Sequence, residues 1–248
     1  MARLPKDVYD PTLQLVDVEM ERLAVESARR QYLGMSAIGD PCSRKLWYGY
    51  HQSAGRTLDA STVRIFADGH RSEAVIAGHL RATPGIKLDI VDPNTGEQFA
   101  VEDHDGEFRG HLDGVIKGLA HDPDTLHVWE AKSANEKKFL AFRKLKDEIG
   151  ELNTLKSWDA VYYAQAQCYM GYGDIDRHYL TVCTPGVRQW EAVVTHFDRT
   201  TFDSLRDKAK RIINAQSPLA RISNDPSWHQ CKWCHFSERC HGVTPLPA

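Results

Sequence analysis

Long apolar runs are missing from this sequence of 248 residues. No stretch approaches the roughly 18 apolar residues that cross a bilayer, so we expect no membrane-spanning helix. The opening residues, MARLPKDVYDPTLQL, also lack the apolar segment of a secretory signal. No G-x4-G-K-S/T loop is present, which excludes a joined helicase or ATPase motor of that type. The sequence therefore predicts a soluble, cytoplasmic protein without a membrane partner.

An excess of positive charge is missing as well, because 31 Lys and Arg residues stand against 34 Asp and Glu residues, a net charge of -3. Phosphate binding usually shows as a surplus of Lys and Arg, so the overall balance counts against a nucleic-acid partner. It does not exclude one, since a basic groove can lie beside acidic metal ligands. Three basic stretches are candidates either for phosphate contacts or for solvated helix faces: Lys137-Lys138, Arg143 to Lys146 and Lys208 to Arg211.

Periodic patterns of apolar residues divide the chain into helices and strands. Helical spacing predicts helices at 12–32, 62–82, 136–147, 157–172 and 198–215. Short β-branched segments between turn residues predict strands at 86–91, 98–102, 107–117, 125–133, 177–184 and 188–196. This order predicts an α/β fold with a small central mixed sheet flanked by helices, in a single domain over 1–248. We divide that domain into a helical N-terminal region (about 1–60), a core (about 61–216) and a cysteine-rich tail (about 217–248).

Two neighbouring predicted strands carry the most informative charged residues. Asp113 lies in RGHLDGVI, and Glu130 and Lys132 lie in HVWEAK, where alternation puts both on one strand face. If the strands pair, all three side chains converge. Two carboxylates can hold Mg²⁺ or Mn²⁺, and an ammonium can position a water or stabilise a charged transition state. The same residues also fit a solvated strand face, because an E-x-K triplet by itself is common.

Other polar residues lie at spacings that would support such a site. His70 and Glu73 are three apart and share one helix face, and the histidine could be a metal ligand or a structural hydrogen-bonding residue. His111 is two residues before the aspartate, on the same strand face, and is interpreted as a substrate-contacting or structural residue. Gln165 and Tyr169 are four apart on a helix and could bind a phosphate or orient the lysine. An ordinary amphipathic helix explains that last pair equally well.

The six cysteines fall into two groups. Cys231, Cys234 and Cys240 form a C-x2-C-x5-C cluster, and three thiolates within ten residues indicate a metal centre that needs a fourth ligand. The candidates for that ligand are Cys42, which follows a turn in a basic context, and the histidines His229, His235 and His241. Cys168 and Cys183 lie in apolar segments and are interpreted as small core residues. Spacing alone does not decide between zinc and iron–sulfur.

In chain order these motifs resemble the RecB-like branch of the PD-(D/E)XK nucleases that carries an iron–sulfur cluster. This branch includes the CRISPR-associated RecB-like exonucleases, the AddB nuclease domain and many phage exonucleases. Leu112 stands where the name-giving proline would be. The matching pieces cover most of the chain: Cys42 with the following RKLWY, Gly69-His70, Gly110 to Asp113, Glu130 to Lys132, Gln165 to Tyr169 and the three late cysteines.

The resemblance implies a restriction-endonuclease-like core and a metal-dependent DNA exonuclease of recombination, repair or CRISPR-type DNA processing, in a bacterial, archaeal or phage-infected cell. It implies DNA ends as substrate, a recombination annealing protein or CRISPR adaptation proteins as partners, and allows a homo-oligomer. The implied catalytic residues are Asp113, Glu130 and Lys132, with Mg²⁺ or Mn²⁺ bound by His70, Asp113 and Glu130. Glu73, His111, Gln165 and Tyr169 would support the site or touch the substrate.

The resemblance also assigns a structural 4Fe-4S cluster to Cys42, Cys231, Cys234 and Cys240, which would tie the tail to the N-terminal region. Two other interpretations stay open. One is a DNA-binding module whose nuclease site is vestigial, and the other is an endonuclease stapled by zinc.

Overall fold

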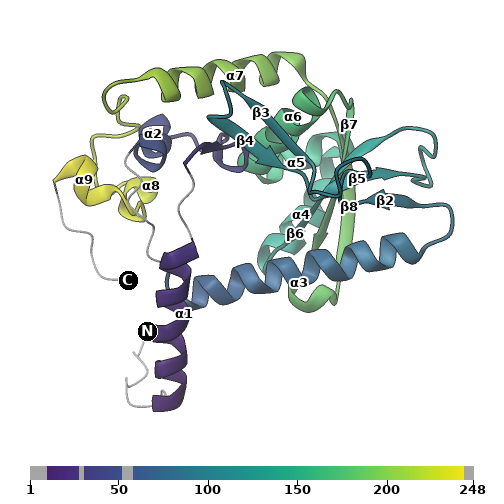
Figure 1. Ribbon diagram of the computed structural model, residues 1–248, viewed down its shortest axis with the longest axis horizontal. Coiled ribbons are helices and arrows are strands. Elements are labelled where there is room, and N and C mark those ends of the chain that lie inside the picture. The colour runs from purple at the N-terminus through teal and green to yellow at the C-terminus, as the bar shows by residue number, and fades with distance from the viewer. Residues whose placement is uncertain (1–9, 28–30, 52–57, 243–248) are drawn as a thin grey trace.

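The computed structural model describes residues 10–27, 31–51 and 58–242. Within them the chain forms an α/β fold with two mixed sheets flanked by helices (Figure 1). The predicted fold class is therefore confirmed. Parts of the expected N-terminal region and helix 12–32, namely residues 1–9, 28–30 and 52–57, lie outside the described residues. Among the described residues, no helix combines the length and the apolar character needed to cross a membrane.

The larger sheet has five strands in the order β2-β5-β6-β7-β8. Its strands are β2 (Lys87–Asp89), β5 (Gly114–Lys117), β6 (His127–Ser133), β7 (Arg177–Cys183) and β8 (Trp190–His196). The central pair β6–β7 is parallel and the other pairs are antiparallel. The side chains of β6 are buried from His127 to Ala131, as expected for a central strand covered on both faces.

The smaller sheet has three strands in the order β1-β4-β3, namely β1 (Leu33–Gly34), β4 (Phe108–His111) and β3 (Ala100–Asp103). The prediction of one continuous strand over 107–117 is therefore wrong, because β4 and β5 belong to different sheets. The Leu112 N–H donates to Phe99 O (3.0 Å), while Gly114 already pairs with Trp129 of β6. The expected central mixed sheet is thus accompanied by a second, smaller sheet, and the two meet at residues 112 and 113.

Helices cover both faces of the larger sheet. On one face α3 (Ala60–Ala82) packs through Ile76 and Leu80 against Trp129 in a small apolar core. On the other face the larger core contains α6 (Ala160–Gly173) and α7 (Arg199–Asn214). Three of the long helices begin at an aspartate whose side chain accepts backbone N–H groups, which is Asp59 for α3, Asp159 for α6 and Asp198 for α7. The helices predicted at these positions are confirmed.

Two further helices connect β6 to α6. They are α4 (Glu136–Ile149), which was predicted, and the separate helix α5 (Glu151–Trp158), which was not. Gly150 separates them with a positive φ of 78°. Short 3-10 turns lie at Met35–Ala37 and Pro185–Val187.

The ends of the described chain lie on one side of the molecule (Figure 1). Helix α1 (Pro11–Ser27) extends away from the sheets and packs against α3. Helix α2 (Ser43–His51), also unpredicted, lies beside the tail helices α8 (His229–Lys232) and α9 (Ser237–His241). Tyr48 of α2 stacks near Phe236, with 5.4 Å between ring centroids. Segments almost a chain length apart in sequence are thus neighbours in space.

Candidate functional site

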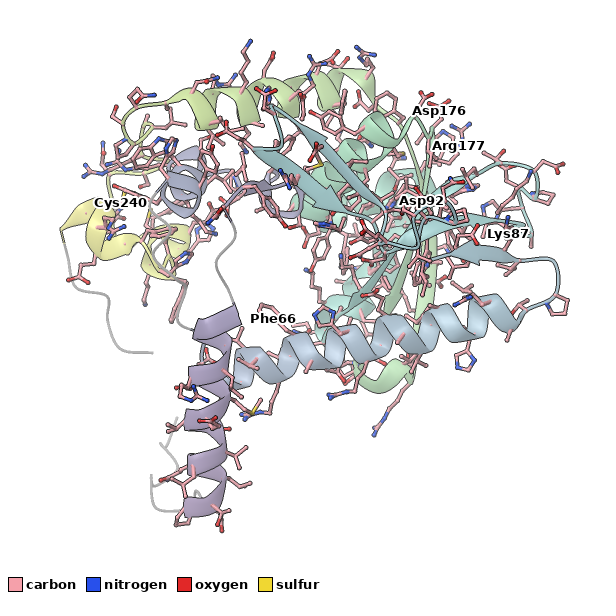
Figure 2. All side chains as sticks on the ribbon, viewed as in Figure 1. Phe66, Lys87, Asp92, Asp176, Arg177 and Cys240 are labelled. Atoms are coloured by element: carbon pink, nitrogen blue, oxygen red, sulfur yellow. The ribbon has the colours of Figure 1, made fainter. Side chains whose placement is uncertain are left out.

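A cleft of about 460 Å³ lies where α3, β4, β6 and α6 approach one another. Figure 2 shows Phe66 near the start of α3, and the same ring lines the cleft. Every residue that the sequence placed in the nuclease site also lines it: His70, Glu73, His111, Asp113, Glu130, Lys132, Gln165 and Tyr169. The structure therefore brings these residues together, while their chemical roles stay predictions.

The acidic centre of the cleft is built on the pairing of β5 with β6. Asp113 lies immediately before β5, and its Oδ2 accepts the backbone N–H of Ala131 at 2.9 Å. Glu130 and Lys132 project from one face of β6, and the Lys132 ammonium donates to Glu130 Oε1. The side chains of Glu130 and Lys132 are only 4% and 19% exposed, so this ion pair lies largely out of water.

Burial and crowding shape the protonation of these groups. Burial raises the pKa of Glu130 to about 8, although the charge of Lys132 opposes the shift. Burial also raises the pKa of Asp113, against the same lysine, and it raises that of Glu73, to which the negative charge of Asp113 adds. For Lys132, burial acts to lower the pKa, but the charges of Glu130 and Asp113 outweigh it and raise the pKa. Three acids and one ammonium thus share a poorly solvated space, which is where an added cation gains most.

The side chains offer a partial fit to a divalent cation. Glu130 Oε2 is buried and has no hydrogen-bond partner, so one carboxylate oxygen is free to accept a cation. The donors near it are oxygens of Asp113 and Glu73, the ligand type that Mg²⁺ and Mn²⁺ prefer. His70 is less engaged, because its side chain is 82% exposed and its Nδ1 lies 4.0 Å from Glu73 Oε2. Over the described ranges, no three His, Cys, Asp or Glu side chains already stand as a group that could hold a metal. The chemistry of the donors fits, and their final spacing needs small side-chain movements.

Helix α6 supports the acidic centre from the other side. Gln165 Nε2 donates to Glu130 Oε1 at 2.9 Å and to the Tyr169 hydroxyl oxygen at 3.0 Å, and both side chains are buried. Tyr162, one turn earlier on this helix, places its ring 5.2 Å from Lys132 Nζ. Sequence reasoning overlooked this tyrosine. Its spacing of three from Gln165 and seven from Tyr169 was the signal that could have identified it.

Strand β4 forms the polar rim of the cleft. His111, at the end of β4, is exposed and lines the cleft as expected for a residue that could touch substrate. Arg109, two residues earlier, also lines it, and its guanidinium lies 5.8 Å from the centre of the Tyr32 ring. Neither Arg109 nor Tyr32 was identified from the sequence, because a single arginine in a strand and a tyrosine before a turn carry no distinctive spacing.

A second cavity, of about 270 Å³, is lined by four cysteines from distant parts of the sequence, Cys42, Cys231, Cys234 and Cys240. Figure 2 labels Cys240 in the tail helices. All four are free thiols. Burial raises the pKa of Cys231, and the charges of the other three thiols raise it further. Within the described part of the chain, these thiols do not yet stand as a group that could hold a metal. Of the histidines considered as a fourth ligand, His241 lines this cavity, whereas His229 and His235 do not.

Hydrogen bonds hold the surroundings of this thiol cavity together. Arg44 donates to the carbonyl of Leu219 (2.7 Å), and the Trp47 indole N–H donates to the carbonyl of Ala215 (2.7 Å). Helix α2 is thereby bound to the segment that leads into the tail. The remaining cysteines, Cys168 and Cys183, are fully buried in the two apolar cores. Their interpretation as core residues is confirmed.

Comparison with known proteins gives evidence on the fold alone. No protein-family model matches the chain, and no curated protein sequence does either. Solved structures share the fold of this chain at low sequence identity. One similar structure is the crystal structure of SSO0001, with a TM-score of 0.50 and 15% identity, covering 96% of this chain and 99% of that one. Another is an alkaline exonuclease (LHK-Exo) from Laribacter hongkongensis, with a TM-score of 0.50 and 12% identity, covering 79% of this chain and 90% of that one.

Proposed function

We propose that this chain is a divalent-metal-dependent DNA exonuclease of the PD-(D/E)XK type. The observation that carries the proposal is the meeting of Asp113, Glu130 and Lys132 in one half-closed cleft. The likeness of the fold to a protein named an alkaline exonuclease supports it. The substrate would be DNA ends, in recombination, repair or CRISPR-type processing, alone or with an annealing or adaptation protein as partner.

The residues of the cleft suit the hydrolysis of a phosphodiester. A Mg²⁺ or Mn²⁺ ion at Asp113 and Glu130, with His70 or Glu73 beside it, would supply a Lewis acid and a water of lowered pKa. The Ala131 N–H holds the Asp113 carboxylate in place, and Gln165 holds that of Glu130.

Lys132 completes this arrangement. Its ammonium lies in a space from which water is largely excluded, where a positive charge stabilises negative charge developing on a phosphoryl oxygen more strongly than in water. The Tyr169 hydroxyl accepts a hydrogen bond from Gln165, which makes Tyr169 a positioning residue in this proposal.

The test is degradation of end-labelled single- and double-stranded DNA with Mg²⁺ or Mn²⁺. The Lys132→Met variant is compared with Lys87→Met, which removes an exposed lysine that faces Asp89 and lies outside the cleft and the thiol cavity. We expect Lys132→Met to lose about 100- to 1,000-fold in kcat and Lys87→Met to retain wild-type activity. Wild-type cleavage by Lys132→Met would end the catalytic assignment. If the wild-type protein binds DNA in saturating Mg²⁺ or Mn²⁺ and does not cleave it, the alternative of a DNA-binding module with a vestigial nuclease site is supported instead.

We also propose that the thiol cavity holds a structural 4Fe-4S cluster, which would place the chain in the RecB-like iron–sulfur branch. The four thiols that line the cavity support this proposal, because iron–sulfur clusters are held by cysteine thiolates. Residues 1–248 would then act as one domain whose tail is clasped to its N-terminal region. Anaerobic purification followed by visible absorbance and by iron, sulfide and zinc analysis tests this. About four irons per chain support the cluster, and one zinc per chain supports the zinc-stapled alternative.

A further inference from the structure

Tyr162 lies between two lysines at the edge of the candidate active cleft. It is the third residue of α6, its side chain is partly buried, and it lines the cleft. The centre of its ring lies 5.2 Å from Lys132 Nζ and 4.8 Å from Lys138 Nζ. An ammonium within about 6 Å of the centre of an aromatic ring is attracted by the negative face of that ring. The Tyr162 ring is therefore a contact of the lysine on which the proposed chemistry depends.

Asp159 holds the surroundings of this ring at the start of the helix. Its Oδ1 accepts the backbone N–H groups of Val161 (3.0 Å) and Tyr162 (3.1 Å). Its Oδ2 accepts the Lys138 ammonium at 2.7 Å, so the charge of Lys138 is already balanced by a carboxylate. The Trp158 ring is a further neighbour, with 5.8 Å between its centroid and that of Tyr162. The backbone of Tyr162 and its second lysine are thus held independently of the acidic centre.

Lys132 differs from Lys138, because its carboxylate partner is also a proposed metal ligand. The Lys132 ammonium donates to Glu130 Oε1. With a divalent cation at Glu130, that carboxylate shares its charge with the ion, and its attraction for the ammonium weakens. The other acid whose charge acts on Lys132 is Asp113, a proposed ligand of the same ion. Hard divalent cations prefer oxygen ligands, so the face of the Tyr162 ring keeps its attraction for the ammonium.

We propose that Tyr162 is a positioning residue for Lys132, whose ammonium it holds by the face of its ring when a metal ion engages Glu130. The inference rests on the proposed nuclease function and adds the residue that keeps this ammonium in the cleft during the reaction. Tyr162 acts through Lys132 and not on the phosphate. Because the ring face carries the contact, the hydroxyl is not required.

Two substitutions separate the ring from the hydroxyl. Tyr162→Phe keeps an aromatic face in the same place, whereas Tyr162→Met keeps a long apolar side chain without a ring. With end-labelled DNA and Mn²⁺, we expect kcat to fall about tenfold in Tyr162→Met and KM to stay within about twofold of the wild type. Tyr162→Phe should retain most of the wild-type kcat. A tenfold loss corresponds to about 1.4 kcal/mol, the size of a partly desolvated contact between an ammonium and a ring.

The second readout reports the position of the lysine and needs no DNA. In protein labelled with ¹³C at the lysine ε-carbon, protons above a ring face resonate upfield of those of an exposed lysine such as Lys87. The Lys132 signal is assigned by its loss in Lys132→Met. We expect this signal to stay upfield when saturating Mg²⁺ is added to the wild type or to Tyr162→Phe. In Tyr162→Met it should lie near that of Lys87.

A folded Tyr162→Met protein with wild-type kcat would overturn the positioning role, while the nuclease function would stand. A wild-type Lys132 signal that moves to the exposed-lysine position in Mg²⁺ would overturn it too, because the ammonium would have left the ring. Equal losses of kcat in Tyr162→Met and Tyr162→Phe would assign the effect to the hydroxyl and also overturn it.

Failure of the nuclease function gives a different result. If the wild type cleaves no DNA but its Lys132 signal stays upfield in Mg²⁺, the nuclease function fails and the contact with Tyr162 stands. Thermal unfolding of both variants close to that of the wild type establishes that folded proteins are compared. If Tyr162→Met does not fold, the wild-type signal in Mg²⁺ still decides whether the ring holds the ammonium.

Discussion

Replacement of Cys42 by serine measures how much of the stability depends on the proposed clasp. Cys42 and Cys231 lie 189 positions apart in the sequence, yet they line one cavity. A centre that binds both closes a loop of most of the chain. The loop-closure relation for a cross-link of this length gives about 5 kcal/mol of lost unfolded-state entropy, an upper value for one ligand of four.

That amount is large beside the roughly 5–15 kcal/mol of total stability of a typical domain. At about 2–4 °C per kcal/mol for a chain of this size, Cys42→Ser should lower the unfolding temperature by about 10–20 °C. Cys240→Ser should lower it less, because Cys42 would still be tied to Cys231 and Cys234 and only a short loop would open.

The assay is anaerobic thermal unfolding followed by circular dichroism, on protein whose metal content has been measured. Cys168→Ala is the control, since it removes a thiol from the apolar core and none from the cavity. Two results would refute the reasoning. One is a Cys42→Ser protein that unfolds within about 2 °C of the metal-loaded wild type. The other is an equal loss for Cys42→Ser and Cys168→Ala.

Three more predictions concern residues around the sheets. Burial lowers the pKa of His178 to about 3 from 6.5, so its neutral imidazole stabilises the fold fully above pH 6.5, and that stability is lost as pH falls toward 3. His178→Leu should therefore flatten the dependence of urea unfolding on pH by about 1.4 kcal/mol per unit in that range, and a profile parallel to wild type would contradict this. Gly110→Ala should cost about 1–3 kcal/mol in the same assay, because its Cβ would collide with the Tyr169 ring; an unchanged midpoint would show that the ring moves freely. Gln165→Leu should cost about 1–3 kcal/mol by leaving Glu130 Oε1 without its amide donor, and wild-type stability would rule out that bond as a support.

The acidic site could be predicted because it depends on local rules. Side chains two apart in a strand share a face, which placed Glu130 beside Lys132 without knowledge of the rest of the fold. The short separation between the Asp113 and Glu130 segments predicted adjacent strands, and β5 does pair with β6. Residues four apart on a helix gave the Gln165–Tyr169 pair in the same way.

Helix α2 could not be predicted, because it depends on contacts between distant segments. Helix α2 is only nine residues long and buries Leu46, Trp47 and Tyr48 in succession, and so short an apolar run does not distinguish a helix from a strand. These side chains are buried because the tail and the end of α7 pack around them, as the bond from Trp47 to Ala215 illustrates. No pattern within α2 encodes that environment.

The strand that was wrongly predicted as continuous also explains how Asp113 reaches the site. Buried residues alternate without a break from Phe108 through Leu112 to Ile116, so the period of two runs across a change of sheet and conceals it. At Gly114 a Cβ would lie 2.7 Å from the carbonyl oxygen of Asp89, so only glycine lets the chain enter the second sheet there. Asp113 lies where the chain passes from the smaller sheet to the larger one, between β4 and β5. Its side-chain Oδ2 accepts the backbone N–H of Ala131 in β6. This carboxylate is held by one backbone bond and retains a second oxygen for a cation, beside the strand that carries Glu130.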